Sequence, residues 1–229
     1  MTTLDGQTLS FSLGGEALFD EIPQWRGSVE GRRINPALWL NNPELDGSFN
    51  ISAEVSGSGF DPQTLESTAE LTLNGERIGG QAFNSLIFDG RINSGRITGF
   101  ARLILEESEI SESAQIGNWQ TDPDYGFEIS LNQFNTAELT VTEPKLLPTR
   151  LNGVLSGSGT LFDPELMAVN AEVRFDSSYV NGEEMETLRA GFRVENSRII
   201  VEDAKLESPI ADASISLNQH LFEFANPSN

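Results

Sequence analysis

The side chains that could perform acid–base or nucleophilic chemistry are few and poorly placed for it. His220 is the only histidine, and it stands near the C-terminus, outside every repeated segment. A Ser-His-Asp triad would need this imidazole as a base held by a precise support. The chain has no cysteine, which leaves no thiolate chemistry and no disulfide. We therefore expect no catalytic residues and no enzymatic activity.

Two acidic stretches are the strongest candidates for binding a cation. Asp122-Pro123-Asp124 lacks the remaining ligands of a calcium loop, and Glu183–Glu186 follows an Asn-Gly turn. Solvated surface acid is the commoner origin of both. Ser56–Gly59 is rich in glycine, but no Lys-Ser/Thr follows it, so it does not match a phosphate loop. The sequence predicts no metal site and no cofactor.

The charge balance argues against nucleic acid and anionic membrane surfaces as partners. The net charge is −21, from 35 acidic against 14 basic residues, and this field repels nucleic acid and anionic bilayers. No apolar stretch approaches the roughly 18 residues of a membrane span, and Met1-Thr2-Thr3 opens no signal peptide. We expect a segment of a longer protein, with any anchor or signal outside this chain.

The chain contains a long internal repeat. Ser56–Gly59, followed by Phe60-Asp61-Pro62, returns as Ser156–Gly159, followed by Phe162-Asp163-Pro164. The tetrads lie 100 positions apart, and Thr160 and Leu161 then widen the offset to 102. Such repeats are typical of elongated proteins in which each unit buries a face against its neighbour. We expect one continuous body over residues 1–229, with quasi-repeats at about 25–50, 51–150 and 151–217.

A third copy of the turn motif occurs at Val29–Pro36. Glycine permits a kink or a positive φ, and Asx-Pro fixes the entry to a short helical turn, so the motif predicts a corner between strands. The apolar residue before Asx-Pro is expected to plug the corner into the core, at Ile34, Phe60 and Phe162. The predicted corner residues are Gly31, Asn35, Pro36, Gly57, Gly59, Asp61, Pro62, Gly157, Gly159, Asp163 and Pro164.

Apolar and polar residues alternate with period two through most of the chain, which is typical of half-buried β-strands. Turn signals such as Asn74-Gly75 separate strands of about ten residues, and helical signal is limited to single turns such as Asn35–Leu40. These patterns predict an all-β antiparallel meander. Apolar residues of one parity are expected to share a face, which holds either an acyl-chain track or a sealed core. They are Phe49, Ile51, Val55, Leu71, Leu73, Leu86, Phe88, Ile92, Phe127, Ile129, Leu131, Val173, Phe175, Phe192 and Val194.

The strand-and-corner pattern resembles the repeats of the AsmA-like family, particularly its TamB branch. Val55–Pro62 carries the resemblance, preceded by Leu45–Ile51 and followed by Leu71–Asn74. Leu155–Leu217 resembles the same repeat. So does Trp25–Gly31 with the residues that follow it, and the whole resemblance covers about Leu9–Leu217.

The resemblance implies a protein of Gram-negative-type envelopes that is anchored in the inner membrane and reaches across the periplasm. Its implied fold is a long, curled β-sheet whose groove is lined with apolar side chains. Its implied roles are phospholipid transfer to the outer membrane and support of outer-membrane protein assembly with a barrel partner. This chain lacks the anchor and any recognisable partner-binding end.

Two other function classes stay open. The chain could be a structural scaffold whose sheet edge pairs with client strands by β-augmentation. It could also be an adhesive or carbohydrate-active repeat. The chain has 14 Phe against 3 Trp and 2 Tyr, and Phe favours core or lipid whereas Trp and Tyr favour sugars and protein surfaces.

Overall fold

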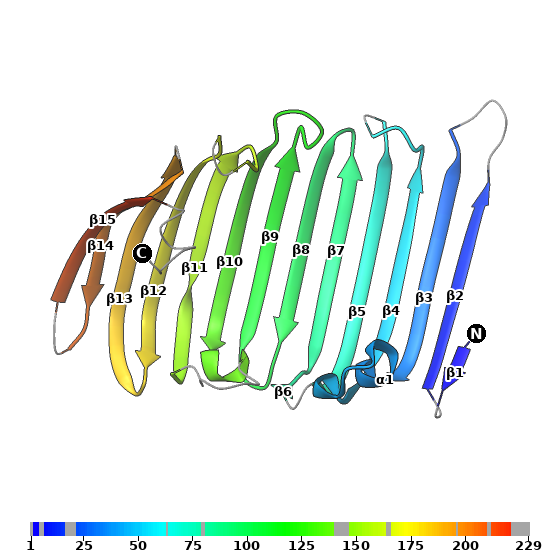
Figure 1. Ribbon diagram of the computed structural model, residues 1–229, viewed down its shortest axis with the longest axis horizontal. Helices are drawn as coiled ribbons and strands as arrows, with labels where there is room; N and C mark the ends of the chain where they lie inside the picture. The colour runs from blue at the N-terminus through cyan, green and yellow to red at the C-terminus, as the bar shows by residue number, and fades with distance from the viewer. Residues whose placement is uncertain are drawn as a thin grey trace.

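The computed structural model describes residues 2–4, 7–16, 22–62, 64–78, 81–139, 147–163, 166–195, 197–209 and 212–220. Within these residues, one fifteen-stranded sheet follows the order of the sequence, and only β6 lies outside the path, paired with β5 (Figure 1). The strands are β1 (Thr2–Leu4), β2 (Gln7–Glu16), β3 (Gln24–Ile34), β4 (Gly47–Ser58), β5 (Glu66–Ile78), β6 (Gln81–Ala82), β7 (Ser85–Asn93), β8 (Arg96–Ile104), β9 (Glu109–Gly117), β10 (Asp124–Phe134), β11 (Thr149–Thr160), β12 (Ala168–Val180), β13 (Glu183–Glu195), β14 (Arg198–Glu207) and β15 (Asp212–His220).

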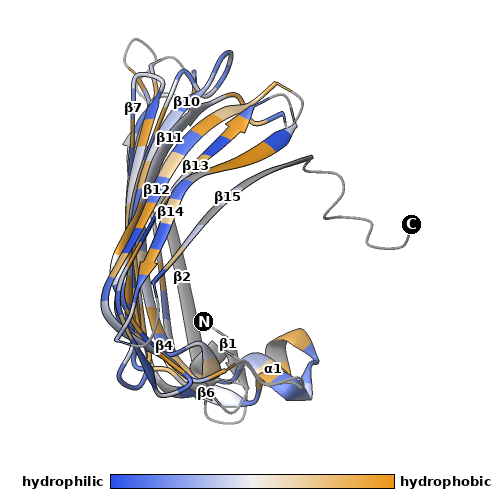
Figure 2. Ribbon diagram, turned by 90° about the vertical axis from the view of Figure 1, so that its left-hand side faces the viewer, coloured by the Kyte–Doolittle hydropathy of each residue, from blue (hydrophilic) through white to orange (hydrophobic). Residues whose placement is uncertain are grey.

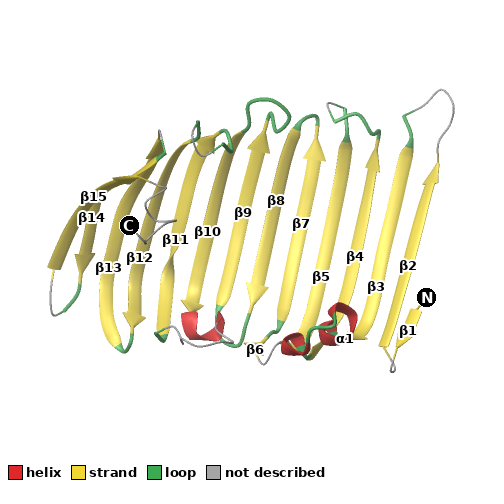
Figure 3. Ribbon diagram, in the orientation of Figure 1, coloured by secondary structure: helices red, strands yellow, loops and turns green. Residues whose placement is uncertain are grey.

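Helical structure in the described residues is limited to three short segments at strand ends (Figure 3). They are α1 (Pro36–Leu40) and the 3₁₀ helices η1 (Pro43–Leu45) and η2 (Thr136–Leu139). The Asn35 side chain accepts a hydrogen bond from the Ala37 N–H, and Pro36 occupies the first turn of α1, where its missing N–H costs nothing. The predicted helical turn at Asn35-Pro36 is therefore confirmed.

The sheet is bent into an open arc and is not closed into a barrel (Figure 2). Every pair of neighbouring strands is antiparallel, so the predicted curled antiparallel sheet is confirmed. Bulges interrupt the register near one end of several strands, for example between Gly31 and Ile34, and such bulges increase local bend and twist. Helix α1 lies on the concave side of the arc (Figure 2).

Matching backbone contacts show that six strands are repeated. In the β3 bulge the Arg33 N–H donates to Asn50 Oδ1 at 3.0 Å, with Arg33 at φ 54°. In the β10 bulge the Gln133 N–H donates to Asn152 Oδ1 at 2.8 Å, with Gln133 at φ 50°. The strand pair β3–β4 thus corresponds to β10–β11. Continuing along the sheet, β3, β4, β5, β7, β8 and β9 correspond to β10 through β15.

The corners at the far end of β4 and β11 also match, and they correct the alignment made from the sequence. Gly59 N donates to the Pro23 carbonyl, and Leu161 N donates to the Pro123 carbonyl, each at 2.8 Å. Gly59 has φ 73° and Leu161 has φ 60°. Leu161 is therefore the counterpart of Gly59, not an insertion after the glycine tetrad. The two extra residues enter before Asn152, upstream of β11, so Gly57 corresponds to Gly159.

A hydrogen-bonded turn follows each of these corners. The Asp61 carbonyl accepts from Thr64 N and Leu65 N, as the Asp163 carbonyl accepts from the amides three and four residues later. The predicted plug is correct only at Ile34, which is 7% exposed. Phe60 is 73% exposed and Phe162 is 57% exposed, and both lie beyond the end of their strand rather than in the core. Pro164 lies outside the described residues.

The predicted corner role is wrong for Gly31, Gly57, Gly157 and Gly159, which lie inside strands. Of the predicted glycines only Gly59 has a positive φ. The four strand glycines are instead sites of close approach. A Cβ on any of them would lie within 3.0 Å of a neighbouring side-chain atom, so the residue type is set by packing.

Candidate binding site: the apolar face of the sheet

The strand register places all fifteen predicted apolar residues on one face of the sheet. Ile51 is opposite Leu73, Leu73 is opposite Leu86, and Leu86 continues through Leu103 and Ile110 to Leu131. Directly opposed residues of an antiparallel sheet point to the same side. Leu131, Gly153, Phe175 and Leu188 carry this row on to Leu206 in β14. The row therefore crosses the sheet from β4 to β14 without a charged residue.

Three further rows cross the sheet parallel to this one, each two residues further along every strand. Phe88, Ile129 and Val173 belong to the next row; Val55, Phe127 and Phe192 belong to the one after it. Ile92 and Val194 belong to the outermost row. The side chains of one strand thus continue into those of the next at the strand spacing of about 4.8 Å. Phe49, opposite Ile34, lies on the same side beyond the first row. We call the surface formed by the four rows and Phe49 the apolar face.

Sequence reasoning did not assign several members of the apolar face. They are Trp25, Val29, Ile97, Leu103, Ile110, Ile116, Leu155, Leu188, Ile199, Val201 and Leu206. In β8, Phe100 and Ile104 are apolar residues of the opposite parity, which hides the alternation. In β9, Glu112 stands where an apolar residue would complete the pattern. The register of the neighbouring strands, rather than any local signal, assigns these positions.

The apolar face is covered at one end of the strands and open along most of its length. Ile34 and Phe134 are buried there, at 7% and 8% exposure, where α1 and η2 follow them directly. Because α1 lies on the concave side, the apolar face is the concave one (Figure 2). The remaining rows are half-buried, and Val55 and Phe88 are each 38% exposed. No second layer seals these rows within the described residues.

The accessible surface supports an unsealed sheet. The chain exposes 15038 Å². A compact monomer of this mass exposes about 10,000 Å². Only six hydrophobic residues of the described chain are buried: Ile34, Phe83, Leu105, Phe134, Met185 and Ala190. The expected alternative of a closed apolar core does not match this burial.

Aromatic side chains pack closely against strand glycines on the apolar face. A Cβ on Gly57 would meet Cζ2 of Trp25 at 2.5 Å, and one on Gly159 would meet the Tyr125 ring at 2.6 Å. Phe127 covers Gly157 in the same way, at 2.8 Å. Because the glycine has no side chain, each ring rests on the backbone of the next strand. The result is a floor of low relief, without a deep pocket for one ligand.

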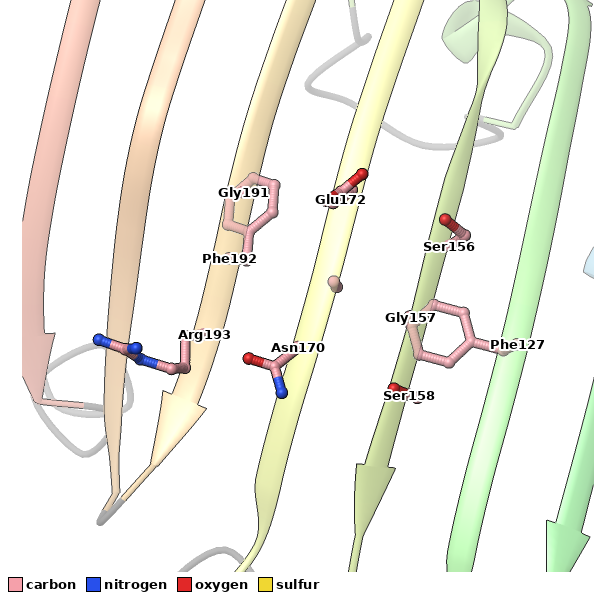
Figure 4. Close-up of a pocket in the computed structure, with 10 residues that line it drawn as sticks. Phe127, Ser156, Gly157, Ser158, Asn170, Glu172, Gly191, Phe192 and Arg193 are labelled. Atoms are coloured by element: carbon pink, nitrogen blue, oxygen red, sulfur yellow. The ribbon is translucent and has the colours of Figure 1, made fainter.

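A shallow hollow of ≈ 450 Å³ lies between two phenylalanine rings, Phe127 of β10 and Phe192 of β13 (Figure 4). Gly157 and Ala171 stand between them in one cross-strand row. Ser156, Ser158, Asn170, Glu172, Gly191 and Arg193, which flank that row along the strands, also contribute to the lining. The hollow is shallow and open to solvent, so it favours a ligand that lies along the sheet over one held in an enclosed pocket.

The other face is polar and carries cross-strand ion pairs. Arg26 bonds Glu54 at 2.9 Å, and Arg102 bonds Glu109 at 2.7 Å. The hydrogen bond and charge of Glu109 raise the pKa of Arg102. On the apolar face, Tyr125 stacks on Phe162, with ring centroids 5.2 Å apart. Desolvation by burial raises the pKa of Tyr125. Because the ion pairs Arg26–Glu54 and Arg102–Glu109 lie on the polar face, the two faces differ in charge as well as in hydropathy.

The described residues contain no group of three or more His, Asp or Glu side chains that could hold a metal ion. His220 ends β15, and nothing is described of its side chain. Asp122 and Asp124 flank the Pro123 carbonyl that caps the Leu161 corner, and Asp124 Oδ1 accepts from Asn118 at 2.9 Å. Asp122 and Asp124 therefore lie at a hydrogen-bonded turn.

Comparison with known proteins gives no family assignment: no family model, curated protein or solved structure matches the chain. No helix in the described part of the chain combines the length and apolarity needed to cross a bilayer. The functional argument therefore depends on the geometry and chemistry of the apolar face.

Proposed function

We propose that this chain is a lipid-conducting segment of a periplasm-spanning envelope protein, and that it carries phospholipid or another acyl-chain ligand between the inner and outer membranes. The observation that supports the proposal is the uninterrupted row from Ile51 to Leu206, on a concave face that no second layer of described residues seals. The segment acts by burial of acyl chains and performs no reaction.

The energetics favour chains over headgroups. Each buried CH₂ contributes roughly 0.8 kcal/mol, so two acyl chains need no polar grip to stay bound. Rings that rest on glycines, such as Trp25 on Gly57, keep the floor level along the row. A level floor gives similar affinity at successive positions, and a ligand that binds equally along a track can move along it.

The envelope location and the link to outer-membrane biogenesis rest on the resemblance of the repeat to the TamB branch. An outer-membrane barrel partner would act through parts of the protein outside this chain. The high negative charge is compatible with this role, because it keeps the outer face solvated and away from anionic bilayers.

Native mass spectrometry of the chain purified from a Gram-negative host, followed by lipid extraction, tests the proposal. We expect phospholipid to co-purify at one or more molecules per chain. The matched control is Phe88→Arg, which places a charge in the track. A lipid-free wild-type mass, together with no uptake of lipid from added vesicles, would contradict the proposal.

A second function is supported by one observation: the sheet is not closed, and no other described strand pairs with the outer edges of β1 and β15. An open edge can take up a client strand by β-augmentation and assist the assembly of outer-membrane proteins. A wild-type chain that binds no lipid but protects an added amphipathic β-strand peptide from hydrogen exchange would favour this scaffold function.

A further inference from the structure

Glu112 is the one charged residue among the described members of the four rows. It lies in β9, directly opposite Ala101 of β8 and Ile129 of β10. The register of β9 is unbroken with both neighbours, so its side chain has the same orientation as those of Ile110 and Ala114. A carboxylate therefore stands on the apolar face.

The second repeat shows that the position does not require a carboxylate. In the first repeat, Glu112 is opposite Ala101, and in the second repeat Ile215 is opposite Ala204. Each pair lies three residues from the last pair before the connecting turn, so the two pairs correspond. The second unit thus has isoleucine where the first has glutamate. The local register differs, because β14 and β15 have a bulge between Val201 and Ala204 and β8 and β9 have none. The isoleucine nonetheless shows that the corresponding strand pair forms without a charge at this place.

The surroundings of Glu112 leave its carboxylate accessible. The residue is exposed, and no hydrogen bond or ion pair to it is found among the described residues. Ala101 and Ala114, its neighbours across and along the strand, are small, which leaves room beside the side chain. A carboxylate in an apolar setting attracts an ammonium and repels a phosphate more strongly than one in bulk water.

Resting on the proposed lipid track, we propose that Glu112 selects lipids by headgroup, favouring those that carry an ammonium, such as phosphatidylethanolamine, over purely anionic lipids such as phosphatidylglycerol. Strand β9 lies near the middle of the sheet order, so a lipid that moves along the track passes this residue. The acyl chains lie on the flanking apolar rows while the ammonium donates to the carboxylate.

The experiment uses the full chain with vesicles of equimolar phosphatidylethanolamine and phosphatidylglycerol. The protein is re-isolated, and the two bound lipids are quantified by mass spectrometry. Wild type should bind an excess of phosphatidylethanolamine. Glu112→Ile, which copies the second repeat, and Glu112→Gln should each lower the ratio about threefold, as expected for one solvent-accessible charge pair. Glu112→Asp keeps the charge and should retain most of the preference.

Glu128→Gln is the matched control, because Glu128 is an exposed carboxylate on the adjacent strand that points to the opposite face. It removes the same net charge and should leave the ratio unchanged. An equal shift in Glu128→Gln would assign the effect to overall charge and overturn the proposal. An unchanged ratio in Glu112→Ile, with lipid still bound, would overturn the headgroup role alone. Absence of lipid from every variant would overturn the track itself, and the headgroup role with it.

Discussion

The Trp25 indole lies so close to Gly57 that a Cβ on that glycine would be 2.5 Å from Trp25 Cζ2. Tyr125 and Gly159 make the same contact in the second repeat. Together with a close backbone carbonyl of the next strand, the pairing explains why glycine recurs near the ends of β4 and β11, where neither residue has a positive φ.

Substitution of Gly57 or Gly159 by alanine should destabilise the chain by about 1–3 kcal/mol, the usual cost of forcing extra volume into a tight contact. Gly99→Ala is the control, because its Cβ would meet Phe88 at 3.7 Å, an ordinary contact. Urea unfolding midpoints compare the three variants. Equal midpoints for Gly57→Ala and Gly99→Ala would show that the ring does not restrict residue 57.

The bulge asparagines satisfy a backbone donor that the bulge removes from the ladder. Asn50→Ala should cost about 1 kcal/mol, because the Arg33 N–H loses its acceptor. Asn50→Asp keeps an acceptor oxygen and should recover most of this loss. Thermal melting followed by circular dichroism measures both changes. If the alanine variant melted at the wild-type temperature, the hydrogen bond from the Arg33 N–H to Asn50 would not stabilise the bulge.

Phe88 and Phe100 provide a matched test of the two faces. They lie on adjacent strands with 38% and 40% exposure, but Phe88 is opposite Ala101 on the apolar face, whereas Phe100 is opposite Asp89 on the polar face. An arginine at either position can extend to solvent, so both variants should stay folded. Phe88→Arg should abolish lipid crosslinking, whereas Phe100→Arg should retain it.

The second half of that test uses Phe192→Arg, also on the apolar face. A photo-reactive residue at a neighbouring track position reports the lipid, and circular dichroism reports the fold. Loss of folding in both Phe88→Arg and Phe192→Arg, with no lipid adduct on wild type, would identify a sealed core and leave only the scaffold function.

The raised pKa of Tyr125 predicts a loss of stability in alkali. Its folded pKa is above the ordinary value near 10, so the folded state holds the proton more tightly than the unfolded state does. The resulting stability is complete below the unfolded pKa and is lost as the pH rises through the folded pKa. Tyr125→Phe should show a shallower decline between pH 9 and pH 11, in the range of that titration. Parallel urea curves for the two proteins at every pH would contradict the assignment.

The sequence by itself determined the strand content, the antiparallel connections and the shared face of residues such as Ile51 and Leu73. These follow from period two and from turn residues such as Ser94-Gly95, which are local properties of the chain. The turn predicted at Asn74-Gly75 is wrong, because both residues lie inside β5. The repeat was also visible, because duplicated strands keep their apolar positions. Helix α1 could be predicted for the same reason, because Asn35 and Pro36 begin it through contacts with residues next to them in the sequence.

Only the tertiary structure decided what depends on partners from other strands. Whether Gly57 lies in a corner or under a ring is set by Trp25, 32 positions earlier in the chain and opposite it in the register. Phe60 and Ile34 have the same place in the motif, but one is exposed and the other buried, because only Ile34 lies where α1 folds over the sheet. Glu112 belongs to the apolar face only through its opposition to Ala101 and Ile129. Burial and facing are relations between distant segments, and no local pattern records them.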